Sequence, residues 1–202
     1  MRSHAGPRVT LVDPAPAIAS AFRDAVQRAG IDVDVVCGAI HDVDADAVVS
    51  PTNSFGFMDG GLDLTHVLHF GDHVQDRVTA TIGTRFDGEL LVGQAVVVRT
   101  DDPRQPFLVA APTMRVPMRL PAGTVNPHLA MRAVLLAIDH HPEPIRSVAV
   151  PGLGTGVGRV PPAVAAHQMI AAVHRVRGGT TRSVARWDLA VEEHVLLTSR
   201  QV

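Results

Sequence analysis

The spacing of apolar residues changes repeatedly along the chain between the pattern of a strand and that of a helix. Compact apolar runs, which are typical of buried strands, occupy residues 8–12, 31–36, 46–49, 91–99, 107–111 and 147–150. Between them, apolar residues recur three and four positions apart, which predicts helices over 16–29, 64–81, 127–140 and 163–176. The last segment, 181–202, is apolar enough to pack back as one more strand or helix.

This alternation predicts an α/β fold in which helices cover both faces of a central sheet. With 202 residues, of which 46% are hydrophobic, the whole chain can form a single domain around one substantial core. In sheets of this kind, ligands bind outside the carboxyl ends of the strands. The segments that follow the strands therefore hold the first candidates for functional residues.

The opening strand–helix–strand unit carries clear boundary signals. Asp13 is a candidate helix N-cap. Pro14 or Pro16 suits the first turn of the helix, and Gly30 suits its end. The turn before the helix has no glycine, so the phosphate fingerprint of dinucleotide-binding units is missing. We therefore expect this unit to be a structural addition to the sheet.

A glycine-rich loop follows the predicted strand 46–49. Asn53 stands at the strand end, and Asp63 falls in the first turn of the next helix, where a carboxylate suits the helix dipole. Three glycines between them allow the backbone to approach a ligand closely: Gly56, Gly60 and Gly61. Strand, glycine loop and helix N-terminus together form a common cradle for phosphates, although a plain polar turn is the alternative interpretation.

A second strand, 147–150, leads into a turn that is even denser in glycine. Backbone amides from Thr155 to Gly158 can supply the many N–H donors that a diphosphate needs. Pro161 and Pro162 suit the first turn of the following helix. Two such loops at two strand ends could hold a diphosphate from both sides.

Together the two loops resemble the macro domain family, the ADP-ribose-binding modules. The first is similar to that family's D-A-hydrophobic-V-x-x-x-N segment and its G-G-hydrophobic-D turn. The second, from Gly154 to Pro161, is similar to its S-T-G-hydrophobic-aromatic-G-aromatic-P loop. The resemblance runs from about Val33 to about Val176, and the Ser-Phe-Gly-Phe-Met-Asp-Gly-Gly variant resembles a bacterial and phage-type branch. It implies a three-layer αβα sandwich with a central mixed sheet.

The resemblance also implies a site. Asn53 matches the family's ribose-binding Asn, and Asp63 matches the Asp that active members use to remove mono-ADP-ribose. From the residues alone, Asn53 could instead shape a turn, and Asp63 could be only a helix-terminal charge. The other implied ligand-binding positions are Ala39, Ile40, Gly60, Gly61, Leu62, Gly154, Thr155, Gly156, Val157, Gly158 and Arg159. No metal and no cofactor are expected.

The adenine side departs from the family pattern. Ala39 stands where most members have the Asp that holds the adenine amino group, so Asp42, Asp44 or the backbone would have to replace it. The chain has no Tyr, which leaves three aromatic candidates for stacking on adenine: Phe86, Phe107 and Trp187.

The ribose and phosphate side departs as well. Gly158 replaces the aromatic residue that lies over the distal ribose in the family. Arg159 replaces the next glycine and could reach a phosphate or the surface of a modified protein. Asp59 stands where many members have a further glycine, and it could add a carboxylate to the site or repel the phosphates and stay outside.

Composition narrows the range of partners. The net charge of −2 at pH 7 argues against a nucleic-acid-binding protein, and the absence of Lys excludes a Lys nucleophile. Cys37 is the only cysteine, so no intrachain disulfide can form and a reducing compartment is favoured. We find no signal-peptide core near the N-terminus and no segment apolar enough to span a bilayer, and we expect a cytoplasmic protein without a membrane partner.

Two further groups of residues invite a functional interpretation. His66, His69 and His73 recur on one face of the predicted helix 64–81 at the spacing of metal ligands, but neither a Cys nor a Glu-x-x-His pattern accompanies them. We favour histidines without a metal, with His66 near the ligand loop. Arg115 and Arg119 could form a rim that contacts an anionic ligand or a partner, or they could simply be solvated.

Four functions stay open. The first is hydrolysis of mono-ADP-ribose esters on acidic residues of proteins, or of O-acetyl-ADP-ribose, with release of ADP-ribose. It rests on Asn53, on the turn that ends at Asp63 and on the second loop. The others are a non-catalytic reader of ADP-ribosylated proteins, a phosphatase acting on ADP-ribose 1″-phosphate, and a nucleic-acid-binding module, which the low charge disfavours.

Overall fold

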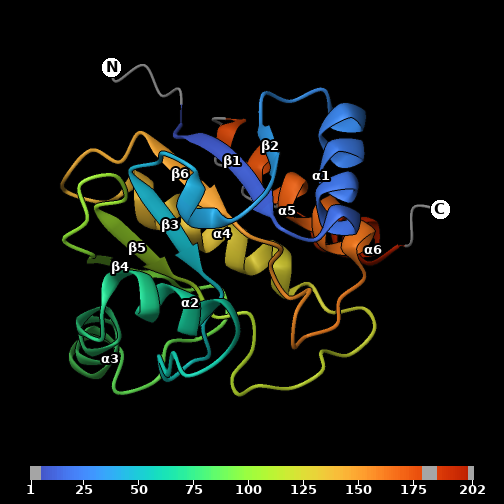
Figure 1. Ribbon diagram of the computed structural model, residues 1–202. Coiled ribbons are helices and arrows are strands. Elements are labelled where there is room, and N and C mark those ends of the chain that lie inside the picture. The colour runs from blue at the N-terminus through green and yellow to red at the C-terminus, as the bar shows by residue number, and fades with distance from the viewer. Residues whose placement is uncertain (1–5, 179–185, 200–202) are drawn as a thin grey trace.

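The computed structural model describes residues 6–178 and 186–199. Six strands form one sheet in the order β2-β1-β6-β3-β5-β4 (Figure 1). Neighbouring strands pair in parallel except β4 and β5, which are antiparallel, so the prediction of a mixed sheet is confirmed. The strands are β1 (Arg8–Asp13), β2 (Asp34–Cys37), β3 (Ala47–Ser50), β4 (Val96–Arg99), β5 (Phe107–Ala110) and β6 (Ser147–Val150).

Helices connect the strands and cover the sheet on both faces (Figure 1). None of the described helices is both long and apolar enough to cross a membrane. A short 3₁₀ turn, η1 (Ile40–Asp42), follows β2. The α-helices are α1 (Pro16–Ala29), α2 (Gly61–Phe70), α3 (His73–Arg85), α4 (Asn126–Asp139), α5 (Pro162–Arg177) and α6 (Trp187–Thr198).

Side chains of the inner strands alternate between two apolar clusters, one on each face of the sheet. Val49 and Val109 belong to the cluster that contains residues of α1, α4 and α5. Val48 and Leu108 belong to the other cluster, which contains residues of α3 and is flanked by residues of α2. This alternation is the two-residue period of a strand, and it produces the predicted three-layer αβα arrangement.

The opening strand is an interior element of the sheet. β1 pairs with β2 on one side and with β6 on the other, so the opening strand–helix–strand unit supplies the two strands at one end of the sheet. Asp13 is not the N-cap of α1, because Ala15 occupies that position. The Asp13 carboxylate instead accepts hydrogen bonds from the backbone N–H groups of Ala15 (2.9 Å) and Gly152 (3.2 Å). The strand end is thereby tied to the loop after β6.

The helix predicted over 64–81 is two helices, so that prediction is wrong. α2 ends at Phe70, and the next residue, Gly71, has a φ of 103° and a ψ of 164°, which suit glycine almost alone. The Gly71 N–H donates to the carbonyl of Val67 at 2.7 Å, and its own carbonyl accepts from Val74 as α3 begins. His73 therefore belongs to α3, and the three histidines do not share one helix face.

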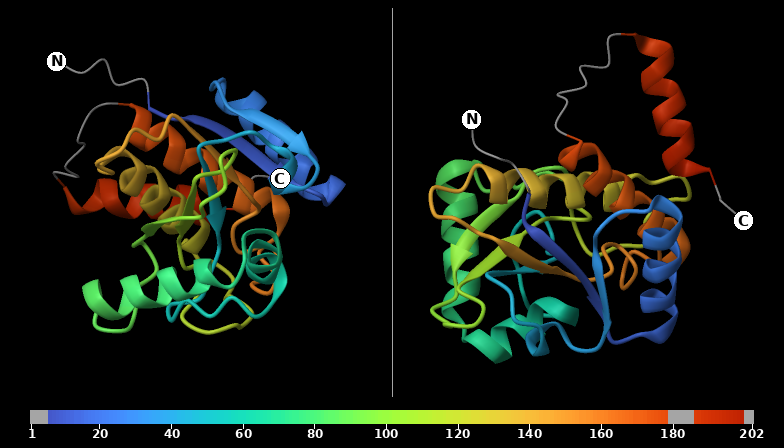
Figure 2. Two further views of the ribbon diagram at one scale, coloured as in Figure 1. Left: turned by 60° about the vertical axis from the view of Figure 1, so that its left-hand side comes forward. Right: turned by 90° about the horizontal axis from the view of Figure 1, so that it is seen from above.

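The C-terminal segment forms a helix outside the three layers. α6 lies beside α5 (Figure 2). An ion pair of Arg175 with Glu193 and a hydrogen bond from the Gln168 side chain to the Leu197 carbonyl (3.1 Å) join the two helices. Leu197 is buried, whereas Trp187 is 82% exposed. The expected packing of the tail is thus confirmed for one turn of α6 but not for its whole apolar surface, and Val184 lies outside the described residues.

Gly71 offers a direct test of the break between α2 and α3. We expect Gly71→Ala to lower the free energy of unfolding by about 1–3 kcal/mol, because a Cβ is strained at this φ and would lie 3.1 Å from the His73 ring. Gly83→Ala is the matched control, since Gly83 lies within α3 with open space around its Cβ position, and we expect a gain of about 0.5–1 kcal/mol. Urea denaturation measures the free energy of unfolding of both variants. Equal changes in the two variants would contradict this account of the break.

Candidate functional site

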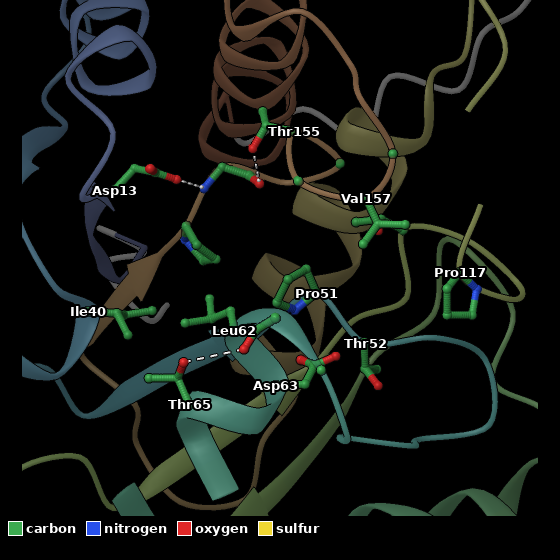
Figure 3. Close-up of a pocket in the computed structure, with 18 of the residues that line it drawn as sticks. Asp13, Ile40, Pro51, Thr52, Leu62, Asp63, Thr65, Pro117, Thr155 and Val157 are labelled. Atoms are coloured by element: carbon green, nitrogen blue, oxygen red, sulfur yellow. Dashed lines mark hydrogen bonds between the residues drawn. The ribbon is translucent and has the colours of Figure 1, made fainter. Parts of the chain in front are cut away.

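A pocket of about 590 Å³ opens at the carboxyl ends of the parallel strands (Figure 3). This volume lies within the range that small-molecule sites occupy. Its lining comes from the segments that follow β1, β2, β3, β5 and β6. All but one of the predicted site positions line it: Ala39, Ile40, Asn53, Gly60, Gly61, Leu62, Asp63, Gly154, Thr155, Gly156, Val157 and Gly158. The exception, Arg159, is exposed and lies outside the lining.

Asp63 is the lining carboxylate whose chemistry is most altered by its surroundings. It lies in the first turn of α2, and the hydroxyl of Ser50, at the end of β3, donates a hydrogen bond to its Oδ1. Burial raises the pKa of the Asp63 carboxyl, the Ser50 hydrogen bond opposes this rise, and the nearby charge of Asp59 adds to it, so that the resulting pKa is about 6. Near neutral pH, Asp63 is therefore mostly ionised yet able to take up a proton.

Asp59 lines the pocket together with Asp63. Of the two positions considered for it from the sequence, the structure shows the one that adds a carboxylate to the site. No Arg is among the lining residues, and the sequence contains no Lys. A bound diphosphate would therefore have to rely on backbone N–H groups and not on cationic side chains.

Asn53 uses its side chain to shape the first loop. Its Oδ1 accepts from the backbone N–H groups of Phe55 (3.0 Å) and Phe57 (3.4 Å), and its Nδ2 donates to the Phe57 carbonyl (2.7 Å). The turn-forming role that the sequence left open is therefore present. An amide nitrogen carries two hydrogens, and within the described residues only one of them has an acceptor. One N–H donor thus remains at the pocket wall.

The first loop is anchored on α3. Gly56 has a φ of 77°, and a Cβ there would lie 2.9 Å from Val78 and 3.0 Å from Ile82. Two residues later, the backbone N–H of Met58 donates to the side chain of Gln75 at 2.7 Å, and Met58 is almost fully buried. The glycine therefore permits the loop to lie directly on the helix, which fixes the position of Asn53.

The second loop leaves several backbone N–H groups free. Thr155 donates its hydroxyl to the Gly152 carbonyl at 2.8 Å, which closes a tight turn. Within the parts of the chain that the structure describes, the N–H groups of three consecutive lining residues have no protein acceptor: Gly156, Val157 and Gly158. Consecutive unpaired N–H groups in a turn form an anion-binding concavity, as the sequence predicted for this loop.

Packing explains why position 158 is a glycine. A Cβ at Gly158 would lie 2.5 Å from the Gly154 carbonyl oxygen and 3.0 Å from the side chain of Leu120. The Gly158 carbonyl also accepts a hydrogen bond from the Leu120 N–H at 2.9 Å, which ties the loop to the segment after β5. An aromatic side chain at 158 has no room, and Pro117 and Val157 instead border this end of the pocket (Figure 3).

The residues suggested for adenine recognition do not reach the pocket. Asp44 forms a surface ion pair with Arg104 at 2.7 Å, and Asp42 is exposed outside the lining. The proposed stacking aromatics also lie elsewhere, as none of the three is in the lining: Phe86, Phe107 and Trp187. The lining aromatic is Phe57, which is 59% exposed. Asp13 and His41 also line the pocket and were missed, because Asp13 reads as a helix cap and His41 belongs to no motif.

The histidines form a packed group beside the pocket. His41 stacks on His69 with ring centroids 3.9 Å apart, and fully buried His66 lies edge-on to His41 at 5.0 Å. Burial, together with the charge of neighbouring His41, lowers the pKa of His66 to about 3, so it is neutral at physiological pH. His73 bonds to the Thr100 carbonyl at 2.9 Å. No cluster of His, Cys, Asp and Glu that could hold a metal occurs among the described residues.

Arg115 and Arg119 do not form a rim on the pocket, and both lie at the surface outside its lining. Arg115 is held by the carboxylate of Glu89 (2.6 and 3.1 Å) and lies over the ring of Phe55. Arg119 is exposed, and neither arginine lines the pocket.

Comparison with known proteins agrees with this geometry. The model of the Macro domain family matches residues 49–169. The chain belongs to the macro domain family. An uncharacterized protein of Aquifex aeolicus is 34% identical over 162 residues, covering 80% of this chain and 93% of that protein. An uncharacterized protein of Aeropyrum pernix is 31% identical over 151 residues, covering 74% of this macro domain and 75% of that protein.

Solved structures show the same fold. The macrodomain of Mycobacterium tuberculosis DarG superposes with a TM-score of 0.58 at 22% identity, covering 69% of this macro domain and 88% of that chain. The Oceanobacillus iheyensis macrodomain with ADP gives a TM-score of 0.56 at 17% identity, with coverage of 67% and 72%. The predicted fold and family are confirmed.

The raised pKa of Asp63 predicts how stability depends on pH. The folded carboxyl, at about 6, binds protons more tightly than an ordinary Asp at 3.8, so its contribution favours folding at low pH and is lost as the pH rises through 6. We expect Asp63→Asn to be more stable than wild type by about 1–3 kcal/mol near pH 7.5, and this gap to shrink by about 2 kcal/mol near pH 4.5. Urea denaturation of both proteins at the two pH values measures this difference in the free energy of unfolding.

Asp24→Asn is the control for this measurement, because Asp24 is exposed on α1. Its effect on stability is expected to be small and the same at both pH values. A gap for Asp63→Asn that does not change with pH would contradict the assignment of the titration to Asp63.

Proposed function

We propose that this macro domain binds ADP-ribose in the pocket and hydrolyses the ester bond that joins ADP-ribose to acidic side chains of proteins, or to acetate in O-acetyl-ADP-ribose. The observation that carries the proposal is Asp63, a partly buried carboxylate with a pKa raised to about 6, in the same pocket as the free N–H groups of the second loop. A general base works best when its pKa lies near the working pH, and Asp63 meets that condition.

The proposed reaction uses one water. Asp63 removes a proton from that water as its oxygen forms a bond to the C1″ carbon of the distal ribose. The bond between C1″ and the ester oxygen breaks, and its electrons leave with the carboxylate of the modified residue. The products are free ADP-ribose, the restored carboxylate and a proton on Asp63, which returns to solvent. Ser50 orients the Asp63 carboxylate, and the N–H groups of Gly156 and Val157 hold the diphosphate.

A non-catalytic reader is the second candidate function. It is favoured by Asn53, whose amide is largely engaged with its own loop and so has less capacity to position a ribose and a water. Calorimetric titration with ADP-ribose, paired with loss of label from a protein carrying glutamate-linked mono-ADP-ribose, separates the two. Binding with label loss supports the hydrolase, and binding without label loss leaves the reader. If the protein shows no binding and no label loss, both functions are contradicted. Release of phosphate from ADP-ribose 1″-phosphate would instead favour the phosphatase.

Replacing the proposed base tests the catalytic assignment. We expect Asp63→Asn to lower the rate of ester hydrolysis by about 100-fold or more, because general-base catalysis typically contributes that much. Asparagine keeps the size of the side chain, so ADP-ribose affinity should change by no more than a few fold. If Asp63→Asn hydrolyses the labelled substrate as fast as wild type, Asp63 is not the base.

Ser50 provides a subtler test. Its hydrogen bond lowers the pKa of Asp63, so Ser50→Ala should raise that pKa and move the acidic limb of the pH–rate profile to higher pH. At pH values well above the shifted limb, the rate should approach that of wild type, which serves as an internal control. A uniform loss of rate at every pH would instead indicate a disturbed site geometry.

A further inference from the structure

The segment 115–120, which follows β5, is tied to both glycine loops. At its start, the Arg115 carbonyl accepts a hydrogen bond from the Ser54 N–H of the first loop at 3.1 Å. At its end, the Leu120 N–H donates to the Gly158 carbonyl of the second loop at 2.9 Å. The side chains between these two ties therefore lie where both loops meet the surface.

This part of the surface borders one end of the pocket. Pro117 and Val157 belong to the lining and lie at the end away from Asp13 (Figure 3). Large apolar side chains are exposed here, since Val116, Met118 and Val157 are between 43% and 58% exposed. Exposed apolar side chains that gather beside a pocket are typical of a surface that contacts another molecule.

Two arginines lie on the same surface. Arg119 precedes Leu120 and Arg159 follows Gly158, so the hydrogen bond between Leu120 and Gly158 brings the two arginines close together. Both are exposed, and neither forms an ion pair within the described residues, whereas Arg115 already has one. Because both lie outside the pocket lining, they can contact a group attached to a pocket ligand but not the enclosed part of that ligand.

Arg159 has an unusual backbone conformation. Its φ of 55° lies in the left-handed region, and the other described non-glycine residues with a positive φ are aspartates, which tolerate this region better. Two hydrogen bonds fix the conformation, from the Arg159 N–H to the Gly156 carbonyl (3.1 Å) and from the Val160 N–H to the Gly154 carbonyl (3.0 Å). Glycine would adopt it without strain. An exposed arginine without an ion pair at a strained position indicates a function outside the fold.

We propose that Arg119 and Arg159, together with Val116, Met118 and Val157, form a docking surface for an acidic segment of the polypeptide that carries the ADP-ribose. This inference rests on the proposed function, in which C1″ of the distal ribose is joined to a protein side chain. A guanidinium can bind a carboxylate through two parallel hydrogen bonds, and the apolar side chains can contact the aliphatic parts of the same segment.

The distribution of charge favours this kind of partner. Asp59 and Asp63 disfavour a further carboxylate inside the pocket, whereas Arg119 and Arg159 attract one just outside the lining. Two cations suit a short run of Asp or Glu in a peptide. A nucleic acid carries a phosphate on every nucleotide, and its binding depends on more cationic contacts than this surface offers.

Two peptide conjugates test the docking surface. Each carries ADP-ribose joined at C1″ through a triazole, which the proposed hydrolysis cannot cleave. Asp and Glu flank the modified position in one peptide, and Asn and Gln replace them in the other. In calorimetric titration at low salt, wild type should bind the acidic conjugate about fivefold more tightly, because two exposed ion pairs together contribute about that much. At about 0.5 M salt the preference should fall to within about twofold, since salt screens exposed charges.

Variants assign the preference to the two arginines. The double variant Arg119→Gln, Arg159→Gly should bind both conjugates within about twofold of each other and keep the wild-type affinity for free ADP-ribose. Arg23→Gln is the control, because Arg23 is an exposed arginine of α1 outside the lining, and it should keep the preference.

Arg159→Gly alone gives a second readout. The midpoint of thermal unfolding should rise by about 2–4 °C as the strain is relieved, while the preference for the acidic conjugate falls by about half. An arginine with only a structural role would not combine a gain in stability with a loss of preference.

The outcomes are separable. Equal affinity of wild type for the two conjugates would overturn the docking surface while leaving ADP-ribose binding intact. A preference that persists in the double variant, or that disappears in Arg23→Gln, would also overturn it. Tighter binding of a single-stranded oligonucleotide joined to ADP-ribose through the same triazole would overturn the choice of a polypeptide. If wild type binds neither the conjugates nor free ADP-ribose, the proposed function itself fails, and the inference fails with it.

Discussion

The parallel pairing of β3 with β6 in the middle of the sheet is the constraint on which the site depends. Val48 lies opposite Ala149 in this pairing, so the two strands end at the same edge and release their loops side by side. Parallel neighbours need long crossovers, and here the intervening chain supplies α2 to α4 and the antiparallel edge. The first loop brings Asn53 and the carboxylates, and the second brings unpaired N–H groups. Neither loop alone encloses the pocket.

The anionic ligand that we propose for this pocket would share it with carboxylates, so the two kinds of group must lie in different parts of the pocket. Asp13 lies at one end, and Asp59 and Asp63 lie near the start of α2. The N–H groups of the second loop supply the positive potential that no lining arginine provides. Backbone donors have fixed positions and need no counter-ion, so they can bind phosphate close to carboxylates without forming ion pairs with them. In the proposed complex, the second glycine loop therefore takes the role that lysine and arginine have in many other phosphate sites.

The sequence predicted the layers from a local signal, and its resemblance to the family predicted the mixed sheet. All but one of the predicted site positions line the pocket, but they make up only about half of its lining. Apolar periodicity located the strands, and the glycine loops located the pocket. The predictions failed where contacts distant in sequence decide the outcome. Asp13 reads as a helix cap until the pairing of β1 with β6 places it beside Gly152. The break at Gly71 depends on one backbone conformation inside an otherwise helical pattern. The role of Asn53 was ambiguous because a turn and a ribose contact need the same amide.

The place of β1 inside the sheet sets the limits of the folding unit. A fragment that starts where the family match starts, at residue 49, would lack β1, β2 and half of β3. The backbone groups of β6 that now pair with β1 would face water along a strand in which Val148, Ala149 and Val150 are apolar and buried on one face or the other. Such an edge invites intermolecular strand pairing. The part of this protein that matches the family model thus leaves a sheet edge open that β1 covers in the whole chain, and β1 also supplies Val12 and Asp13 to the pocket lining.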